Sequence, residues 1–256
     1  DALLSRGLGD VYKRQISMGI KQIIAVASAK GGVGKSTICA NLASYFSQDF
    51  KVGILDADIY GPNQHILFDV FNSKPEVKTI DGHKSFIPIE VNNIFLNSMG
   101  FILDKDKAAM WRGPMLSGAI KQLKDLTQWG DLDYLFIDMP PGTGDAYLTV
   151  ASEIKPNNVL LVTSQSKLAV QDTIKSKAMV DKLKIPMIGV IDNMSYSIHP
   201  DSDKQIFEFD PIDLESKIGL KVLGSIPRTK ELAEFNPKKL SSYFESVYNK
   251  ILKATL

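Results

Sequence analysis

A glycine-rich run that contains two lysines is the part of this 256-residue chain best suited to chemistry. It reads AKGGVGKST over residues 29–37 and follows an apolar stretch at 22–28. Glycine allows backbone amides to turn inward around phosphate oxygens, and the N-terminus of a following helix adds positive charge. We therefore predict a loop that binds a nucleotide through these residues: Ala29, Lys30, Gly31, Gly32, Val33, Gly34, Lys35, Ser36 and Thr37.

Two side chains of this loop have expected roles in phosphate and metal binding. Lys35 would contact the β- and γ-phosphates, and the Ser36 hydroxyl would complete the shell of a magnesium ion. The loop departs from the usual G-x-x-x-x-G-K-[ST] pattern, because Ala29 stands at the first glycine position and Lys30 lies inside the loop. The alternative is a tight turn without a ligand, which the spacing and context of the GKS residues disfavour.

Carboxylates are expected beside this loop, because an acidic motif follows the next apolar strand. LDADIYGPN at 55–63 brings Asp56 and Asp58 to the rim of the predicted sheet. Near magnesium, one carboxylate can hold a metal-bound water while the other orients the water that attacks the phosphate. A D-x-D pair is also common at a capped strand end, so this motif is weak when it stands alone.

A second acidic motif, LDYLFIDMPPGTGD at 132–145, is typical of a Walker B strand followed by a loop stiffened by proline. Asp138, at the end of this strand, would bind magnesium through water. The backbone N–H of Gly142 or Gly144 is a candidate sensor of the γ-phosphate. An ordinary strand end with a turn is the alternative, and the presence of the other two motifs disfavours it.

Bringing these motifs together requires a sheet whose strands end at one edge. Short runs rich in Val, Ile and Leu alternate with helical stretches from residue 22 onward, which predicts a doubly wound α/β fold with a mostly parallel sheet. Ligands of such sheets bind beyond the carboxyl ends of the strands. The predicted strands are 22–28, 51–56, 94–98, 133–138, 158–163, 186–191 and 221–225, and the predicted helices are 35–48, 114–127, 145–153, 168–183 and 212–218.

Length and composition indicate a globular protein with one domain over residues 18–256. Residues 1–17 show neither helical nor strand periodicity, and we expect them to be a non-native or disordered lead. The 30 Lys and Arg residues balance 29 Asp and Glu residues, so charge does not favour nucleic-acid binding. A single cysteine, Cys39, and the lack of a run of ~20 apolar residues favour a cytoplasmic protein without a membrane span.

Together the motifs resemble those of the Mrp/ApbC family of iron–sulfur cluster carrier ATPases, which have the MinD/ParA (SIMIBI) type of P-loop NTPase fold. The resemblance implies a slow, magnesium-dependent ATPase that forms a homodimer through its nucleotide face and acts in iron–sulfur cluster assembly or delivery. The motifs that carry the resemblance are KGGVGKST, LDADIYGPN, WRGPM at 111–115, WGDLDYLFIDMPPGTGD at 129–145 and DNMSY at 192–196.

The resemblance also implies roles for individual residues. Lys30 would reach across the dimer to the partner's nucleotide and stabilise transition-state charge as an arginine finger does; a solvated loop lysine is the alternative. Asp58 would act on the attacking water. Asn193 would hydrogen-bond adenine, and the loop at Pro227 and Arg228 would border the base. The magnesium site that the resemblance implies comprises Ser36, Asp58 and Asp138.

One feature of the cluster-carrying members is missing from this chain. Their C-P-x-C motif follows N-M-S-Y, whereas here the corresponding residues are His199, Pro200, Asp201 and Ser202. Iron–sulfur clusters are held mainly by thiolates, and serine is a poor replacement. Cys39 is expected to be a buried core residue. We therefore expect no conventional cluster in this protein, and a possible client or cluster-bearing partner protein instead.

The C-terminal segment and the function leave alternatives open. Apolar residues at helical spacing predict a final helix that either docks on the domain, which we favour, or lies on a membrane surface as in MinD. A MinD/ParA-like positioning or regulatory ATPase is one alternative function. A scaffold that binds nucleotide without hydrolysing it is another. The residues of the apolar stripe are Leu240, Tyr243, Phe244, Val247, Tyr248, Ile251 and Leu252.

Overall fold

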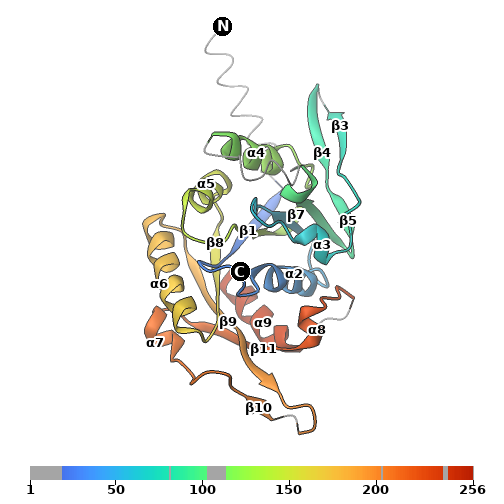
Figure 1. The fold of residues 1–256 in the computed structure, drawn as a ribbon. Helices are drawn as coiled ribbons and strands as arrows, with labels where there is room; N and C mark the ends of the chain where they lie inside the picture. Colours follow the sequence, from blue (N-terminus) through green and yellow to red (C-terminus); the bar gives the residue numbers. More distant parts are fainter. Residues whose placement is uncertain (1–18, 81, 103–113, 203, 239–241, 256) are drawn as a thin grey trace.

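The fold is a large sheet covered by helices on both faces, with a separate two-stranded hairpin beside it (Figure 1). The computed structural model describes residues 19–80, 82–102, 114–202, 204–238 and 242–255. Three expectations concern residues outside these ranges and stay predictions: the lead at 1–17, the 111–113 part of the WRGPM motif, and Leu240.

Within the described ranges the main sheet has nine strands, which are β1 (Ile20–Ala27), β2 (Val52–Asp56), β5 (Ile89–Val91), β6 (Ile94–Ser98), β7 (Leu132–Asp138), β8 (Asn158–Thr163), β9 (Met187–Ile198), β10 (Gln205–Ile206) and β11 (Val222–Arg228). Their order is β10-β9-β8-β1-β7-β2-β6-β5, and β11 pairs with β9. Only β5 and β10 pair antiparallel within the described sheet. The predicted doubly wound, mostly parallel fold is therefore confirmed.

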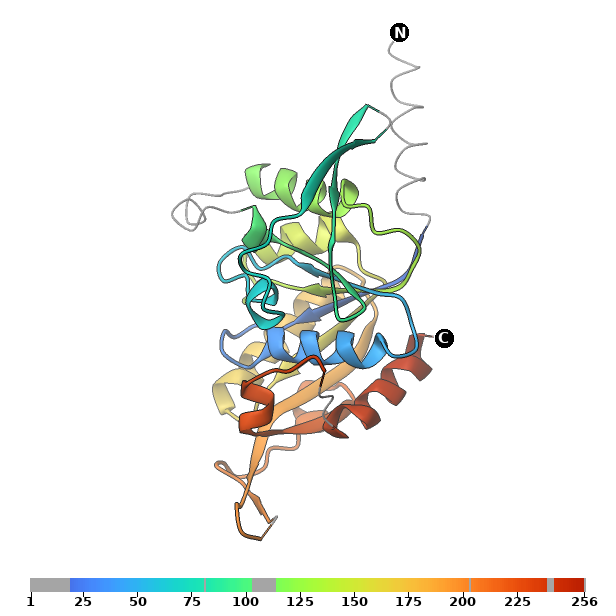
Figure 2. The same ribbon diagram turned by 90° about the vertical axis from the view of Figure 1, so that its right-hand side faces the viewer.

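Helices form a layer on each face of the sheet (Figures 1 and 2). One layer contains α2 (Lys35–Phe46), α8 (Lys230–Ala233) and α9 (Glu245–Thr255), and the other contains α4 (Pro114–Asp125), α5 (Asp145–Ile154), α6 (Lys167–Lys182) and α7 (Leu214–Ile218). Successive strand side chains point to opposite faces. In β1, Ile24 and Val26 therefore pack in the core beside α2, while Ala25 and Ala27 pack in the other core. Two buried faces explain why such strands are apolar throughout.

Several short elements escaped the sequence analysis. These are α3 (Gln64–Leu67), β3 (Glu76–Ile80), β4 (His83–Ile87), β5, β10 and α8. Every residue of β3 is exposed, so this strand lacks the alternation that predicts a half-buried strand. The prediction for 186–191 was too short, because β9 continues to Ile198. The motif at 192–196 consequently lies within a strand and not after one.

The C-terminal helix docks on the domain, as we favoured. In α9, Val247 and Ile251 are fully buried in the core that also contains residues of α2. The Tyr248 hydroxyl donates to Asp49 Oδ2 at 2.7 Å, and the hydroxyls of Tyr134 and Thr255 lie 3.1 Å apart. These contacts use the apolar stripe that a membrane-surface helix would need to expose.

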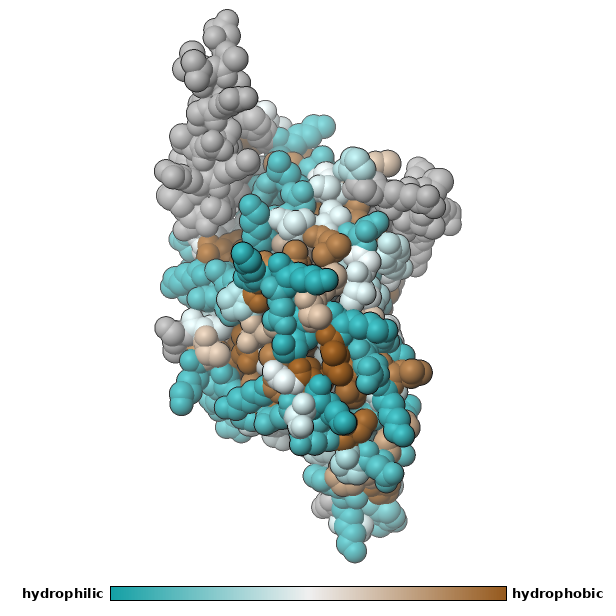
Figure 3. All heavy atoms as spheres, turned by 90° about the vertical axis from the view of Figure 1, so that its left-hand side faces the viewer, coloured by the Kyte–Doolittle hydropathy of each residue, from teal (hydrophilic) through white to brown (hydrophobic). Residues whose placement is uncertain are grey.

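The outer surface is largely polar on the side where α6 and α7 lie in Figure 1. On this face apolar atoms form small groups between hydrophilic side chains (Figure 3). Among the described residues, none of the helices combines the length and the apolar character that crossing a membrane requires.

Candidate functional site

The glycine-rich loop connects β1 to α2 at the carboxyl edge of the sheet, where the sequence predicts it. Gly32 and Gly34 both have φ of 83°, a left-handed conformation that favours glycine. The loop is held from behind by Asn193, whose Nδ2 donates to the Val33 carbonyl at 2.8 Å. A Cβ at Gly34 would collide with this same amide group. Gly34 is thus required by its backbone conformation and by the close approach of β9.

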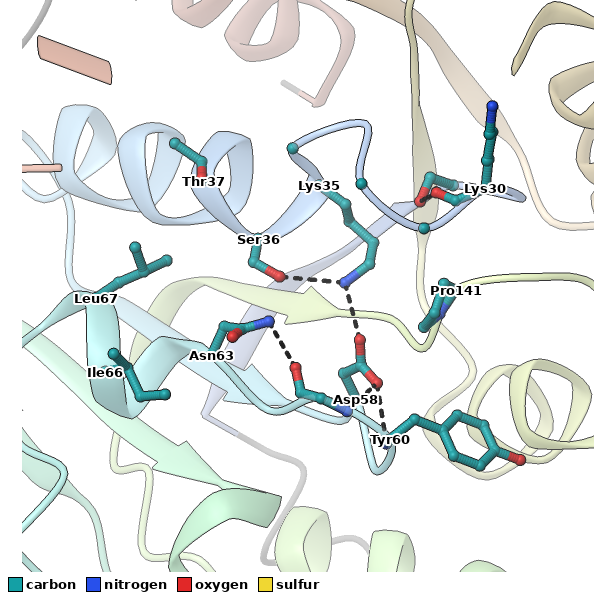
Figure 4. Close-up of a pocket in the computed structure, with 15 residues that line it drawn as sticks. Lys30, Lys35, Ser36, Thr37, Asp58, Tyr60, Asn63, Ile66, Leu67 and Pro141 are labelled. Carbon is teal, nitrogen blue, oxygen red and sulfur yellow. Dashed lines mark hydrogen bonds and ion pairs between the residues drawn. The ribbon is translucent and has the colours of Figure 1, made fainter. Parts of the chain in front are cut away.

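Lys35 lies at the centre of a buried charge cluster. Its side chain is 6% exposed, and its Nζ lies 2.5 Å from Asp138 Oδ1 and 3.5 Å from Asp58 Oδ2. The Ser36 hydroxyl is 3.4 Å from the same ammonium (Figure 4). Burial alone would lower the pKa of Lys35, but the carboxylates of Asp138 and Asp58 outweigh burial and raise the pKa above its ordinary value. Lys35 is therefore a permanent cation at the base of the loop.

Asp56 is a second fully buried carboxyl group in this cluster. It lies directly opposite Asp138 in the register of β2 and β7. Burial, followed by the charge of Asp138, raises the pKa of Asp56 to about 8. Its oxygens accept hydrogen bonds from Ser98 Oγ at 2.9 Å and from the backbone N–H groups of Asp58 and Gln64. Asp56 therefore holds a proton more readily than an ordinary aspartate, and its hydrogen bonds order the chain that carries Asp58.

Gln64 is a residue of this cluster that the sequence analysis missed. It begins the four-residue helix α3 and is completely buried. Its Nε2 donates to Asp138 Oδ2 at 2.8 Å and to the Ser36 carbonyl at 3.0 Å. The run GPNQHIL has turn residues followed by too few helical positions to produce a periodic signal. Only the packing of α3 against the loop brings this amide into the site.

An open pocket of about 490 Å³ lies in front of this cluster. Seven of the residues predicted to bind nucleotide line the pocket, together with Asp58 and the exposed Tyr60. The Lys30 side chain points away from Lys35 and Asp58 (Figure 4). Asp58 is held in place because its Oδ1 accepts the backbone N–H groups of Tyr60 and Gly61, both at 3.1 Å. The seven residues are Lys30, Gly31, Gly32, Gly34, Lys35, Ser36 and Thr37.

Other predicted residues do not line this pocket. The backbone N–H of Gly142 donates to the Ser28 carbonyl at 3.1 Å, so a γ-phosphate would have to displace this bond to reach it. Arg228 is exposed at the end of β11 and lies 3.4 Å from Glu208, beside a separate shallow pocket. Residues outside the lining of the main pocket also include Ala29, Val33, Asp138, Asn193 and Pro227.

The donor atoms of the cluster suit a magnesium ion that is bound together with a nucleotide. Magnesium prefers oxygen ligands and usually binds through one or two carboxylates, with phosphates and water completing its shell. Asp58, Asp138 and Ser36 supply such oxygens, and Gln64 Oε1 is a buried acceptor with no donor among the described residues. In the part of the chain that the structure describes, no three His, Cys, Asp or Glu side chains could hold a metal by themselves.

The residues that replace the C-P-x-C motif do not fit an iron–sulfur cluster. His199 and Ser202 lie at the turn between β9 and β10, where the His199 ring nitrogen Nδ1 accepts the Asp201 N–H at 3.2 Å. Cys39 is fully buried in α2, and burial raises its pKa well above the ordinary value for a thiol. Cys39 is thus the buried core residue that we expected, and the described residues offer no accessible thiolate.

Asp192 precedes Asn193, the residue that holds the glycine-rich loop, and it makes the free energy of unfolding depend on pH. It is 2% exposed, and burial raises its pKa to about 6 although a 2.6 Å hydrogen bond from Gln165 opposes the shift. The unfolded chain ionises this group near pH 4. Between about pH 4 and pH 6 the native state therefore binds more protons than the unfolded state, and stability falls as pH rises through this window.

We expect the Asp192→Asn variant to lack this contribution. Its free energy of unfolding relative to the wild type should rise by about 2–3 kcal/mol between pH 4 and pH 7, because a shift of one pKa unit corresponds to about 1.4 kcal/mol. Urea unfolding of both proteins at the two pH values measures this difference. A difference that is the same at both pH values would contradict the raised pKa.

Comparisons with known proteins identify the family of this chain. Residues 19–254 match the ParA family model described as NUBPL iron-transfer P-loop NTPase. The chain is 44% identical to the iron-sulfur cluster carrier protein of Aquifex aeolicus, over 89% of this chain and 63% of that protein. It is 43% identical to the iron-sulfur cluster carrier protein of Pseudomonas fragi, over 84% of this chain and 76% of that protein. The chain thus spans less than two thirds of the Aquifex relative.

Solved structures give the same result for the fold. One is a nucleotide-binding protein of Archaeoglobus fulgidus in complex with ADP, which is 32% identical to this chain with a TM-score of 0.77. The match covers 92% of this chain and 96% of the Archaeoglobus chain. The cell division ATPase MinD of Pyrococcus furiosus is 22% identical with a TM-score of 0.67, covering 91% and 99%, which shows a shared fold. The chain, which carries a glycine-rich loop beside a buried lysine and carboxylates, belongs to the ParA family of NUBPL-type iron-transfer P-loop NTPases.

Proposed function

We propose that this protein is a magnesium-dependent ATPase that switches between monomer and dimer and acts in iron–sulfur cluster assembly or delivery. The single observation that carries the proposal is the buried cluster of Lys35, Asp58 and Asp138 behind a glycine-rich pocket. Relatives with 43–44% identity are named iron-sulfur cluster carriers. The geometry of the site supports ATP hydrolysis, and the names of these relatives support a role in iron–sulfur cluster transfer.

Each residue of the site has a separate proposed role in hydrolysis. Phosphate oxygens would compete with Asp138 and Asp58 for the Lys35 ammonium and would accept hydrogen bonds from the loop amides. Bound magnesium would supply the positive charge that phosphoryl transfer requires. Asp138 and Ser36 would hold the ion, and Asp58, which faces the pocket, would orient the attacking water. Gln64 would keep Ser36 and Asp138 in place.

Lys30 is the residue that we propose to act across the dimer. Its side chain lies at the pocket but points away from the Lys35 cluster, so it does not complete the site of its own subunit (Figure 4). If a second subunit faced this pocket, the Lys30 ammonium group would enter the nucleotide site of that second subunit. ATP would thereby join two subunits, and hydrolysis would loosen them. This arrangement makes hydrolysis slow in the monomer.

The cargo is proposed to be an iron–sulfur cluster that a partner protein holds or receives. The described residues present no accessible thiolate, and His199 with Ser202 is a poor substitute for two cysteines. We therefore assign the chain a switching role in cluster transfer without a conventional cluster of its own. The MinD-like alternative has support from the fold alone, and α9 is packed on the domain.

The proposal is tested by measuring oligomeric state and phosphate release with ATP and magnesium, before and after anaerobic treatment with iron and sulfide. We expect ATP to shift the protein from monomer to dimer, slow phosphate release, and no stoichiometric cluster. Calorimetry that finds no binding of ADP or ATP would refute the ATPase. A stable, stoichiometric cluster that is lost in the His199→Ala variant would instead refute the exclusion of a cluster at this turn.

A further inference from the structure

Gln64 connects the two elements that are proposed to hold magnesium. Its Nε2 donates to the Ser36 carbonyl at 3.0 Å, in the first turn of α2, and to Asp138 Oδ2 at 2.8 Å, at the end of β7. Its backbone N–H donates to Asp56 Oδ2 at 3.0 Å. The residue therefore contacts three elements, and its side-chain amide alone joins the two that are most distant in sequence.

The hydrogen bond from Gln64 also holds one of the two oxygens of the buried Asp138 carboxylate. Oδ2 is engaged by Gln64, while Oδ1 faces the Lys35 ammonium at 2.5 Å. Lys35 and Gln64 therefore hold the two oxygens of this carboxylate together, and removing Gln64 leaves Oδ2 without its described donor. Magnesium demands nearly ideal octahedral geometry with short oxygen distances, so a small change in the separation of its ligands is costly.

A second buried glutamine shows what a purely structural amide looks like in this protein. Gln165 Nε2 donates to Asp192 Oδ2 at 2.6 Å, and its Oε1 accepts the Ile212 N–H at 2.8 Å, so both ends of the amide are paired. In Gln64, by contrast, Oε1 is buried and has no donor among the described residues. Buried amide oxygens are normally paired. The unpaired oxygen in Gln64 is an acceptor that a hydrated ion beside Asp138 could satisfy.

We propose that Gln64 is a positioning residue for magnesium, whose amide sets the separation and orientation of Ser36 and Asp138. This inference rests on the proposed function, because it concerns the metal used with the nucleotide. Gln64 acts through Asp138 and Ser36 and does not itself contact the phosphates. The phosphate contacts of the loop are therefore independent of it, and the two effects can be measured separately.

Calorimetric titration of ADP, once with magnesium and once with EDTA, tests this proposal. In Gln64→Leu we expect the affinity for ADP in EDTA to stay within about threefold of wild type, because the loop amides and Lys35 remain. The gain in affinity on adding magnesium should fall by about 10-fold or more, the usual loss when a group that orients a metal ligand is removed. Circular dichroism establishes that the variant is folded, and Gln64→Met replaces it if Gln64→Leu does not fold.

The matched control is Gln165→Leu, the same change at a buried glutamine that bonds a different aspartate. Its magnesium effect should equal that of the wild type, even though its stability falls. If Gln64→Leu keeps the full magnesium effect, or if Gln165→Leu loses it equally, the inference about Gln64 is wrong while the proposed function stands. If the wild type itself binds no ADP, or binds it equally well without magnesium, the proposed function fails.

Discussion

Replacing Lys35 by methionine is expected to remove about 3–5 kcal/mol from the free energy of unfolding and to weaken ADP binding by about 100-fold. The stability loss arises because the change leaves Asp138 and Asp58 as buried carboxylates without their cation. The binding loss arises because hydrogen bonds from the ammonium to phosphate are charge-assisted. Urea unfolding without ligand and calorimetry with ADP measure the two effects.

Lys177→Met is the matched control for this prediction. Lys177 pairs with Asp181 at 2.8 Å, on the surface of α6 and one helical turn away. An exposed pair at this spacing contributes about 0.3–0.5 kcal/mol, because solvent screens the charges. The contrast between the two lysines therefore measures the effect of burial. A loss below about 1 kcal/mol in Lys35→Met would show that the carboxylates do not depend on this cation.

The Lys30→Ala variant is expected to lose about 10³-fold in phosphate release while its stability stays within about 0.5 kcal/mol of wild type. Lys30 has no ion pair with another described residue, so its removal leaves no buried charge behind. The catalytic loss follows if its ammonium stabilises transition-state charge in the partner's site. Phosphate release at saturating ATP and magnesium, combined with urea unfolding, measures both quantities.

Mixing two inactive variants distinguishes action across the dimer from action within one subunit. In a dimer of Lys30→Ala with Asp58→Ala, the site of the Lys30→Ala subunit keeps its own Asp58 and receives Lys30 from its partner. We expect phosphate release to recover in this mixture and to stay low in either variant alone. No recovery, although mixed dimers form, would mean that Lys30 acts within its own subunit or has no catalytic role.

The motifs of the site could be predicted because each is a local pattern. The loop at 29–37 combines glycines, lysines and a strand-to-helix context within nine residues, and α2 does begin at Lys35. Asp58 and Asp138 stand just after or at the ends of apolar strands, and parallel strands place their carboxyl ends at one edge. The continuous apolar runs of the strands, separated by helical stretches, likewise predicted a sheet buried on both faces.

The contacts that complete the site could not be predicted, because they join residues far apart in the chain. Asn193 reaches Val33 across 160 positions, and Gln64 reaches Asp138 across 74. Neither residue belongs to a local pattern that indicates its partner. The short helix α3 has too few residues for periodicity, so the burial of Gln64 depends on how α3 packs against the loop.

The sequence by itself was sufficient to determine the doubly wound fold, the glycine-rich loop between strand and helix, and the lack of paired cysteines, since these depend on residue type and on spacing along the backbone. Only the tertiary structure decided that Lys35 is paired with Asp138 and Asp58, that burial raises the pKa of Asp56, and that the Gln64 amide links the first turn of α2 to β7. The physical reason is that burial and charge proximity are properties of packing: a carboxylate at a strand end has no particular pKa or partner until the neighbouring strands exclude water around it.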